Sequence, residues 1–175
     1  MERRLHRLGD HLPVNALGLR LGENTLYTFT GGADGGNPLR LVTDGRNLYG
    51  VNIGGGCSGP NCPHGIQGAG ASTVFMLSPS NGNWTHTVIR DFEGLYDAGI
   101  TIDTAGSLYV AVDCGGLYSN GYVFKLTPSG GTRIYTDLYD FQGGNNGSWP
   151  WAVSVDQQGN VFGTTTNENV FEISP

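Results

Sequence analysis

Short runs of alternating apolar and polar residues recur along the chain in a fixed order. Two such runs flank an Asp and a turn, a third ends in Pro, and a fourth ends in Phe before a Gly-rich loop. Alternation over four to eight residues between turn-forming residues predicts β-strands. The first and second runs together are RLVTDGRNLYG (40–50), ITIDTAGSLYV (100–110) and VSVDQQGNVFG (153–163). The third runs are STVFMLSP (72–79), GYVFKLTP (121–128) and ENVFEISP (168–175); the fourth are TLYTF (25–29), TVIRDF (87–92) and YTDLYDF (135–141).

The repeat predicts an all-β fold of the β-propeller type. A period near 50 residues with four strands per unit is typical of propeller blades and not of helical repeats. Residues 1–23 lie outside the repeat, and residues 24–175 form one domain whose copies span about 24–83, 84–131 and 132–175.

Three four-stranded blades are fewer than the four to eight of most propellers. We therefore expect a partial ring, or one that a homo-dimer completes. The chain enters the repeat on a fourth-type strand (25–29) and leaves it on a third-type strand (170–174). In a closed ring the first of these would pair with the last blade and protect two strand edges.

These strings also resemble a known family. TLYTFTGGADGGNP, DGRNLYG, YVFKLTPSGG and NVFGTT are similar to the GloVer-type choice-of-anchor tandem-repeat proteins of bacterial surfaces, over residues 24–175. The resemblance implies an extracellular or cell-surface location. Neither a signal peptide nor an anchor is visible in the sequence.

Composition narrows the function classes. Glycine is abundant, with 30 in 175 residues, and only 14% of residues are charged, which suits a turn-rich β protein. The net charge is −6, and Lys125 is the only lysine, so the basic stripe of a nucleic-acid-binding protein is missing. No apolar run is long enough to span a membrane as a helix.

Most recurring polar and aromatic residues are expected to serve the fold. Asp44, Asp103 and Asp156 each open a tight turn and would accept hydrogen bonds from backbone N–H groups. A catalytic or calcium-binding carboxylate cluster is the rejected alternative. The recurring Phe and Tyr residues of the strands would fill the space between blades.

The copies differ most in one connection, between the second and third strands. The number of residues between the aromatic of the second strand and the Phe of the third strand is largest in the first copy (Tyr49 to Phe75), smaller in the second and smallest in the third (Phe162 to Phe171). Variable loops on a constant scaffold often carry binding residues. Because antiparallel strands reverse direction at each step, two kinds of connection lie on the same side of the sheets. These are the connections between second and third strands and the connections that lead from a fourth strand into the next copy. The candidate ligand-binding residues of this face are Tyr96, Tyr118, Trp149 and Trp151.

Cysteine spacing suggests a disulfide instead of a metal site. Cys57 and Cys62 lie in one Gly-rich loop with a single His64 nearby, which is not the ligand set of structural zinc. A local Cys57–Cys62 disulfide is the favoured interpretation, with Cys114 as an alternative partner. No metal or cofactor is expected.

The sequence thus favours a non-enzymatic surface module that binds a glycan or a protein partner. A polysaccharide-acting lyase or hydrolase is the alternative, with Asp113 and Glu168 as copy-specific acidic candidates. A gene fragment without independent function is the third possibility. No Ser-His-Asp pattern or phosphate-binding loop is present to favour an enzyme.

Overall fold

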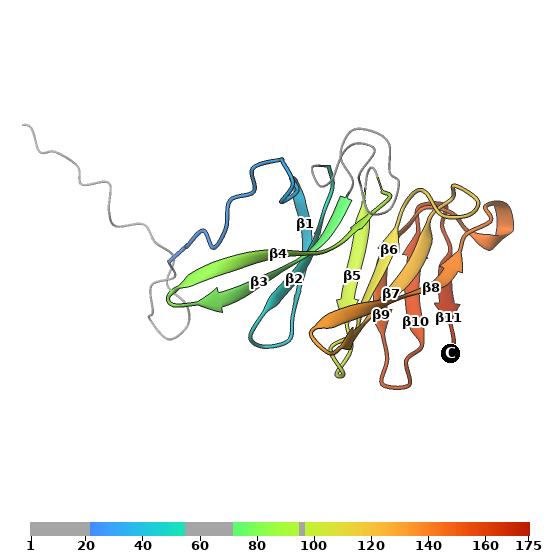
Figure 1. Cartoon of the computed structure of the whole chain (residues 1–175). Helices are drawn as coiled ribbons and strands as arrows, with labels where there is room; N and C mark the ends of the chain where they lie inside the picture. Colours follow the sequence, from blue (N-terminus) through green and yellow to red (C-terminus); the bar gives the residue numbers. More distant parts are fainter. Residues whose placement is uncertain (1–21, 55–71, 95–96) are drawn as a thin grey trace, which may run out of the picture.

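The computed structural model describes residues 22–54, 72–94 and 97–175, and they form an all-β structure. Three antiparallel sheets follow one another along the chain and lie side by side in a row (Figure 1). The sheets are named sheet 1, sheet 2 and sheet 3 in chain order. The predicted all-β character is confirmed.

Each sheet is a simple meander of neighbouring strands. Sheet 1 has the order β1-β2-β3-β4, sheet 2 the order β5-β6-β7-β8 and sheet 3 the order β11-β10-β9. The strands are β1 (Pro38–Thr43), β2 (Leu48–Asn52), β3 (Ser72–Ser80), β4 (Asn83–Phe92), β5 (Ala98–Ile102), β6 (Leu108–Val112), β7 (Tyr122–Ser129), β8 (Thr132–Asp140), β9 (Pro150–Val155), β10 (Val161–Thr165) and β11 (Val170–Ile173). A short 3-10 turn, η1 (Gly144–Asn146), precedes β9.

Among these described residues, no helix has the length and apolarity required to cross a membrane.

The hairpins that join the third and fourth strands use two-residue turns. In sheet 1 the turn residues Asn81 and Gly82 have φ values of 49° and 81°, and in sheet 2 Gly130 and Gly131 have 54° and 87°. Positive φ at both central positions fits the turn twist to the twist of the strands, and Asn and Gly adopt it most readily. Local sequence therefore fixes the register of both long hairpins.

Two apolar clusters hold the three sheets together. The first joins sheet 1 to sheet 2, and the second joins sheet 2 to sheet 3. In the first cluster Tyr49 of β2 is buried against sheet 2, and in the second cluster Tyr109 of β6 is buried against sheet 3. Burial of such side chains stabilises the stack by roughly 25 cal/mol per Å² of apolar surface.

A ring contact of the same kind occurs three times. The Phe that ends a fourth-type run packs on the Phe of the third strand in the following sheet, with ring centroids 4.9, 5.8 and 5.0 Å apart. The pairs are Phe29–Phe75, Phe92–Phe124 and Phe141–Phe171, of which the last two lie at the junctions between sheets. The three Phe residues that were predicted to be equivalent thus pack in the same way.

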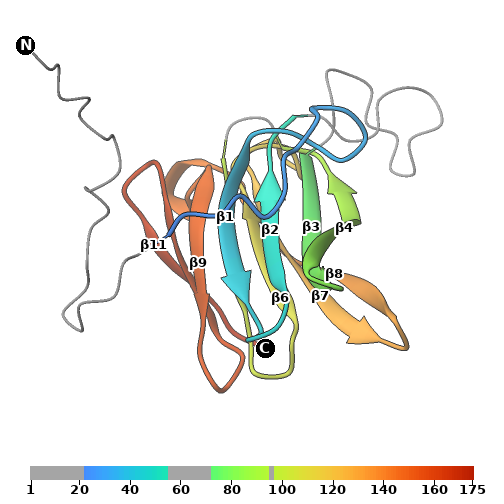
Figure 2. The same ribbon diagram turned by 90° about the vertical axis from the view of Figure 1, so that its left-hand side faces the viewer.

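The N-terminal run departs from the sequence prediction. Residues 25–29 form no strand and do not pair with sheet 3; among the described residues, no fourth strand lies beside its third strand β11. Instead they run across the exposed side of sheet 1 (Figure 2). The reason is geometric: a fourth-type run packs on the sheet after it, and sheets 1 and 3 lie at opposite ends of the row (Figure 1).

This N-terminal segment closes over His86 of β4. The Tyr27 ring stacks on the imidazole with centroids 4.8 Å apart, and Phe29 meets it edge-on at 5.3 Å. The Tyr27 hydroxyl donates to the carboxylate of Asp34 at 3.0 Å. Nε2 of His86 is buried and has no hydrogen-bond partner. Desolvation by burial lowers the pKa of His86, and the opposing charge of Asp34 only partly offsets this effect.

The lowered pKa of His86 predicts a pH-dependent stability. Because the folded pKa lies below the unfolded value of about 6.5, the unfolded chain takes up the proton first as the pH falls. The stabilisation is complete above that value and is lost as the pH falls through the folded pKa. We expect the Tm to fall between about pH 7 and pH 5 in the parent chain but less in His86→Phe, which keeps a ring. Parallel Tm profiles for the two proteins would contradict this prediction.

Candidate ligand-binding face

Of the connections predicted to share one side, those that the structure describes in full do so. The β6–β7, β8–β9 and β10–β11 connections gather at one end of the sheets, and the β1–β2, β5–β6 and β9–β10 turns lie at the other (Figure 1). The first end is called the loop face from here on. It also includes the starts of the inner strands β1, β5 and β9.

Trp149 is the bulkiest of the described residues of this face that have a positive φ. Its φ is +58°, a left-handed conformation that bulky side chains adopt rarely. Its N–H donates to the carbonyl of Asn120 at 2.8 Å, and its carbonyl accepts from the N–H of Thr166 at 3.1 Å. The side chain nevertheless remains 48% exposed. Three connections therefore meet at a Trp that is held in a costly conformation with half of its surface open.

Tyr118 belongs to the β6–β7 connection beside Trp149. Its side chain is about half exposed. The side-chain amide of Asn120 donates to the Tyr118 carbonyl at 3.0 Å, and the N–H of Leu117 donates to the Asp140 carboxylate at 2.6 Å. The loop is thus fixed at both ends, and the same Asn120 anchors Trp149. We infer that Tyr118 and Trp149 are presented by one connected framework.

Trp151 lies on the inner strand β9 and meets a charged pair from the other two sheets. Arg40 of β1 forms an ion pair with Asp97, which immediately precedes β5, at 3.2 Å. The Arg40 guanidinium also lies 5.9 Å from the centroid of the Trp151 ring, within the range of a weak cation–π contact. All three side chains are partly exposed. The cluster therefore joins all three sheets at the loop face.

A glycine allows the inner strands to come this close. A Cβ on Gly99 of β5 would lie only 2.7 Å from the carbonyl oxygen of Trp151. Sheets 1 and 3 have Arg40 and Ala152 at the equivalent place, as the strand pairings show. Sequence reasoning missed the Arg40–Asp97 pair. The available signal was that Arg40 is the only charged residue within the three inner strands.

The structure brings three of the four predicted binding residues to one face. Tyr118, Trp149 and Trp151 are all exposed there, whereas Tyr96 lies outside the described residues. Cys57 and Cys62, predicted to form a disulfide, also lie outside them.

The two acidic candidates of the enzyme alternative are not joined to each other. Asp113 follows β6 and is buried, with Oδ1 lacking a hydrogen-bond partner. Glu168 is exposed in the β10–β11 turn with a φ of +69°. No hydrogen bond links the two residues in the described part of the chain.

The recurring aspartates at the opposite end are turn residues, as predicted. Asp44 accepts hydrogen bonds from the N–H groups of Arg46 and Asn47 at 2.9 and 2.7 Å and from the Tyr49 hydroxyl. Asp103 and Asp156 accept equivalent pairs of backbone N–H groups.

These bonds control the ionisation of the turn carboxylates. Desolvation alone would raise the pKa of Asp103, but the hydrogen bonds from Ser107, Tyr109 and Ala105 outweigh it and lower the pKa. In Asp156 the side-chain amide of Asn160 is the largest cause of a lowered pKa. A carboxylate held in its charged form by its own turn is poorly suited to act as an acid or base.

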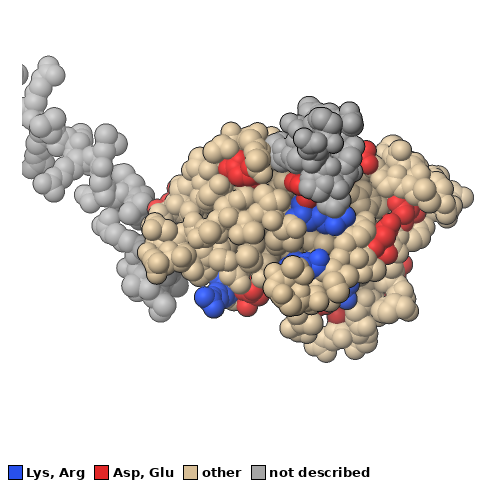
Figure 3. Space-filling view, viewed as in Figure 1, with Lys and Arg blue, Asp and Glu red and all other residues tan. Residues whose placement is uncertain are grey.

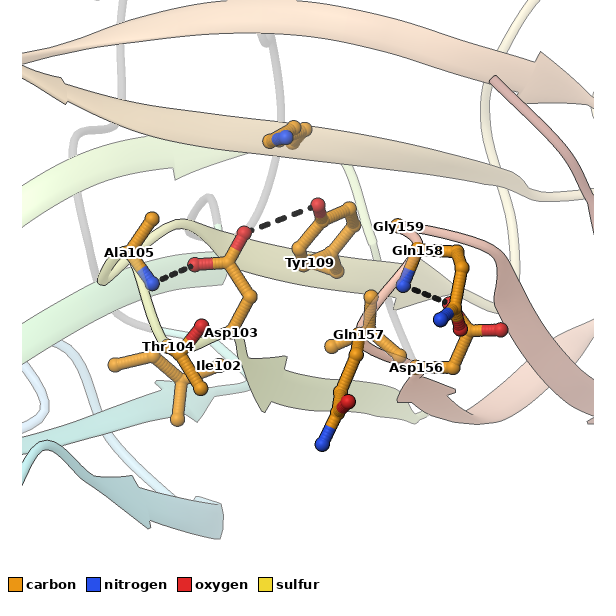
Figure 4. Close-up of a pocket in the computed structure, with 11 residues that line it drawn as sticks. Ile102, Asp103, Thr104, Ala105, Tyr109, Asp156, Gln157, Gln158 and Gly159 are labelled. Atoms are coloured by element: carbon orange, nitrogen blue, oxygen red, sulfur yellow. Dashed lines mark hydrogen bonds between the residues drawn. The ribbon is translucent and has the colours of Figure 1, made fainter.

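A hollow of about 590 Å³ lies between two of these turns, where sheets 2 and 3 meet. Asp103, Tyr109, Asp156 and Gln157 are among the residues that line it (Figure 4). Figure 4 shows the Asp103 carboxylate directed at Ala105 and Tyr109, and the N–H of Gln158 directed at Asp156. Since both carboxylates are used by the fold, this hollow is a weaker candidate site than the loop face.

No group of three or more His, Cys, Asp or Glu side chains that could hold a metal occurs within residues 22–54, 72–94 and 97–175.

Comparison with known proteins identifies no family for this chain. Neither a protein-family model nor a curated protein matches the chain. The resemblance to GloVer-type repeats therefore stays a prediction from the sequence.

Proposed function

We propose that the chain is a non-enzymatic binding module in which the three sheets are consecutive blades of a β-propeller, and that its loop face binds a glycan. The strand order within the sheets and the recurring Phe–Phe junctions support the propeller arrangement. An extracellular or cell-surface location is part of the proposal and follows from the family resemblance.

The conformation of Trp149 carries the functional part of the proposal. A non-glycine residue in the left-handed region costs roughly 1–2 kcal/mol, and such strain tends to persist at functional sites. An exposed ring gains little packing energy in return. We infer that the exposed ring of Trp149 is held in this conformation to bind a ligand.

Glycan is the ligand class that this surface fits best. Exposed aromatic rings offer flat apolar faces for the C–H faces of sugars, and the Arg40–Asp97 pair offers donors and acceptors for hydroxyl groups. Charged side chains are sparse on the molecular surface seen in Figure 3. A strongly charged ligand would find few partners there, whereas a neutral saccharide needs none.

A glycan array with two Trp149 variants tests the proposal. Trp149→Ala removes the ring and keeps the strained backbone, whereas Trp149→Gly removes both. We expect both variants to lose array binding, with Trp149→Gly the more stable of the two by about 1 kcal/mol in chemical denaturation.

Trp84→Ala is the matched control, because Trp84 lies on β4 beside the β3–β4 turn, at the end of the sheets opposite the loop face. It should leave array binding unchanged. If the parent chain binds no glycan but retains a protein partner through Trp149, the ligand class is wrong. If both Trp149 variants bind as the parent does, the site is wrong.

A polysaccharide-acting enzyme is the second candidate, and Asp113 favours it, because its Oδ1 is buried and has no hydrogen-bond partner among the described residues. An assay of polysaccharide cleavage with Asp113→Asn and Glu168→Gln decides this alternative. Cleavage by the parent that both variants lose would support an enzyme, and absence of cleavage by the parent would exclude it for the polysaccharides tested.

A further inference from the structure

Each junction between sheets is made by two complementary faces. The trailing face of a sheet packs on the leading face of the next one. Tyr109, Ala111 and Val123 belong to the trailing face of sheet 2, and Val153 and Val161 to the leading face of sheet 3. The first junction repeats this arrangement with the equivalent positions. The two junctions therefore show how each sheet packs on the sheet that follows it.

Sheet 3 has a trailing face on which none of the described residues of another sheet packs. By strand pairing, Val170 of β11 is equivalent to Val74 of β3 and Val123 of β7. Val74 and Val123 are fully buried, with 0% of their surface exposed, whereas Val170 is 81% exposed. The same side chain at the same position is thus buried in two sheets and open in the third.

Sheet 1 has the matching leading face, also partly open. Leu41 of β1 is equivalent to Ile100 of β5 and Val153 of β9, both of which pack against the preceding sheet. Leu41 is 56% exposed, and its neighbour Leu39 is also exposed. Figure 2 looks onto this side of sheet 1.

A segment that resembles a fourth strand lies at this end of the molecule, and among the described residues β11 has no fourth strand beside it. Residues 24–29 (NTLYTF) correspond to the last six residues of β4 and to residues 136–141, which end β8 and continue to Phe141. Phe29 already packs on Phe75 as Phe92 packs on Phe124. The segment thus occupies the place of a fourth strand that belongs to a preceding sheet, and β11 is the strand edge that such a segment would join.

We propose that the leading face of sheet 1 and residues 24–29 dock on the trailing face of sheet 3 and the edge of β11 in a second copy of this chain. Residues 24–29 would become the fourth strand of the partner's sheet 3. The internal junctions are the template for every part of this contact.

The size of the assembly rests on the propeller arrangement proposed above. Two copies joined reciprocally supply six sheets, which lies within the four to eight blades common in propellers. A head-to-tail contact of this kind forms a closed ring when the rotation allows it. A closed ring removes both exposed faces and both open strand edges at once.

The internal hairpins also fix the register of the new strand pair. Met76 lies opposite Thr87, and Lys125 lies opposite Thr136. The equivalent residues are Glu172 of β11 and Asn24 of the second copy. Cα atoms of opposite residues in antiparallel strands are about 4.5–5.5 Å apart, a distance that a disulfide can bridge.

Light scattering and cross-linking of the full chain, without ligand, test this inference. We expect a mass twice the 18.6 kDa of the chain. The double variant Asn24→Cys, Glu172→Cys should form a disulfide between two chains on mild oxidation, seen on a non-reducing gel. Each single variant, and Asn24→Cys combined with Gln158→Cys at an exposed turn, should not.

Val170→Lys gives a second measure, because Val170 is exposed in the single chain. It should weaken dimerisation at least about tenfold while the monomer keeps its circular dichroism spectrum. A monomer at all soluble concentrations, a species larger than two chains, or a disulfide within one chain would overturn the proposal. Because no ligand is used, failure here is distinct from failure of glycan binding at Trp149.

Discussion

Replacing Phe124 with alanine is expected to lower the free energy of unfolding by about 3–5 kcal/mol, the usual cost of truncating a buried Phe. Phe124 is fully buried where sheets 1 and 2 meet. Its ring lies 5.3 to 5.8 Å from the rings of Phe92, Tyr122 and Tyr135. Truncation would leave a cavity that rings from two sheets cannot easily fill. Urea or guanidinium denaturation followed by circular dichroism measures the change.

Phe171→Ala is the matched control for this substitution. Phe171 occupies the same position on the leading face of sheet 3 and packs on Phe141, but it is only partly buried, since among the described residues no fourth strand lies beside β11. We expect it to cost clearly less than Phe124→Ala, since part of the cavity would open to water. Equal losses in the free energy of unfolding for the two variants would contradict the difference in burial between Phe124 and Phe171.

The second large effect is expected at a turn. Replacing Asp103 with alanine removes an acceptor that serves the N–H groups of Ala105 and Ser107 and the hydroxyl of Tyr109. Hydrogen bonds to a charged group contribute about 1.5–3 kcal/mol each when buried, and partial exposure reduces this here. We expect a total loss of about 2 kcal/mol in the free energy of unfolding.

Asp156→Ala and acid titration provide the controls. Asp156 serves a similar turn but accepts from the side-chain amide of Asn160 instead of a tyrosine hydroxyl, because Phe162 stands where Tyr109 stands in sheet 2. Its replacement should cost less, since Asn160 is partly exposed and can bond to water, whereas Tyr109 is buried. The lowered pKa of Asp103 means that its stabilisation is present above the unfolded value of about 3.9 and is lost as the pH falls further. Asp103→Ala should therefore lose less stability than the parent between about pH 4 and pH 2; an unchanged acid profile would contradict the assigned hydrogen bonds.

Features that recur three times were predictable from the sequence. The Asp that opens each turn, and the Phe that ends each fourth-type run, depend on local hydrogen bonding and on strand alternation. The same residue type therefore stands at the same position in each of the three copies. The shared side of the longer connections followed from strand direction alone, and the exposed positions of Tyr118 and Trp149 agree with it.

Features that occur once were not predictable. The Arg40–Asp97 pair joins residues 57 positions apart and depends on the close approach of inner strands past Gly99. The left-handed backbone of Trp149 is imposed by hydrogen bonds from two neighbouring connections, which leave no local pattern. The place of residues 25–29 was predicted wrongly, because the sequence shows which strand type they resemble but not whether the last sheet of the same chain can reach them.

The central claim is that a ligand binds at the loop face through Trp149 and Trp151. The chain has three tryptophans, and each gives one indole N–H signal in an NMR spectrum. Trp84 lies on β4 beside the β3–β4 turn, at the opposite end of the sheets, and serves as an internal reference. During titration with a glycan found on the array, the account predicts that the Trp149 and Trp151 signals shift while that of Trp84 stays in place. Binding that shifts Trp84 alone, or that leaves all three indole signals unmoved, would contradict it.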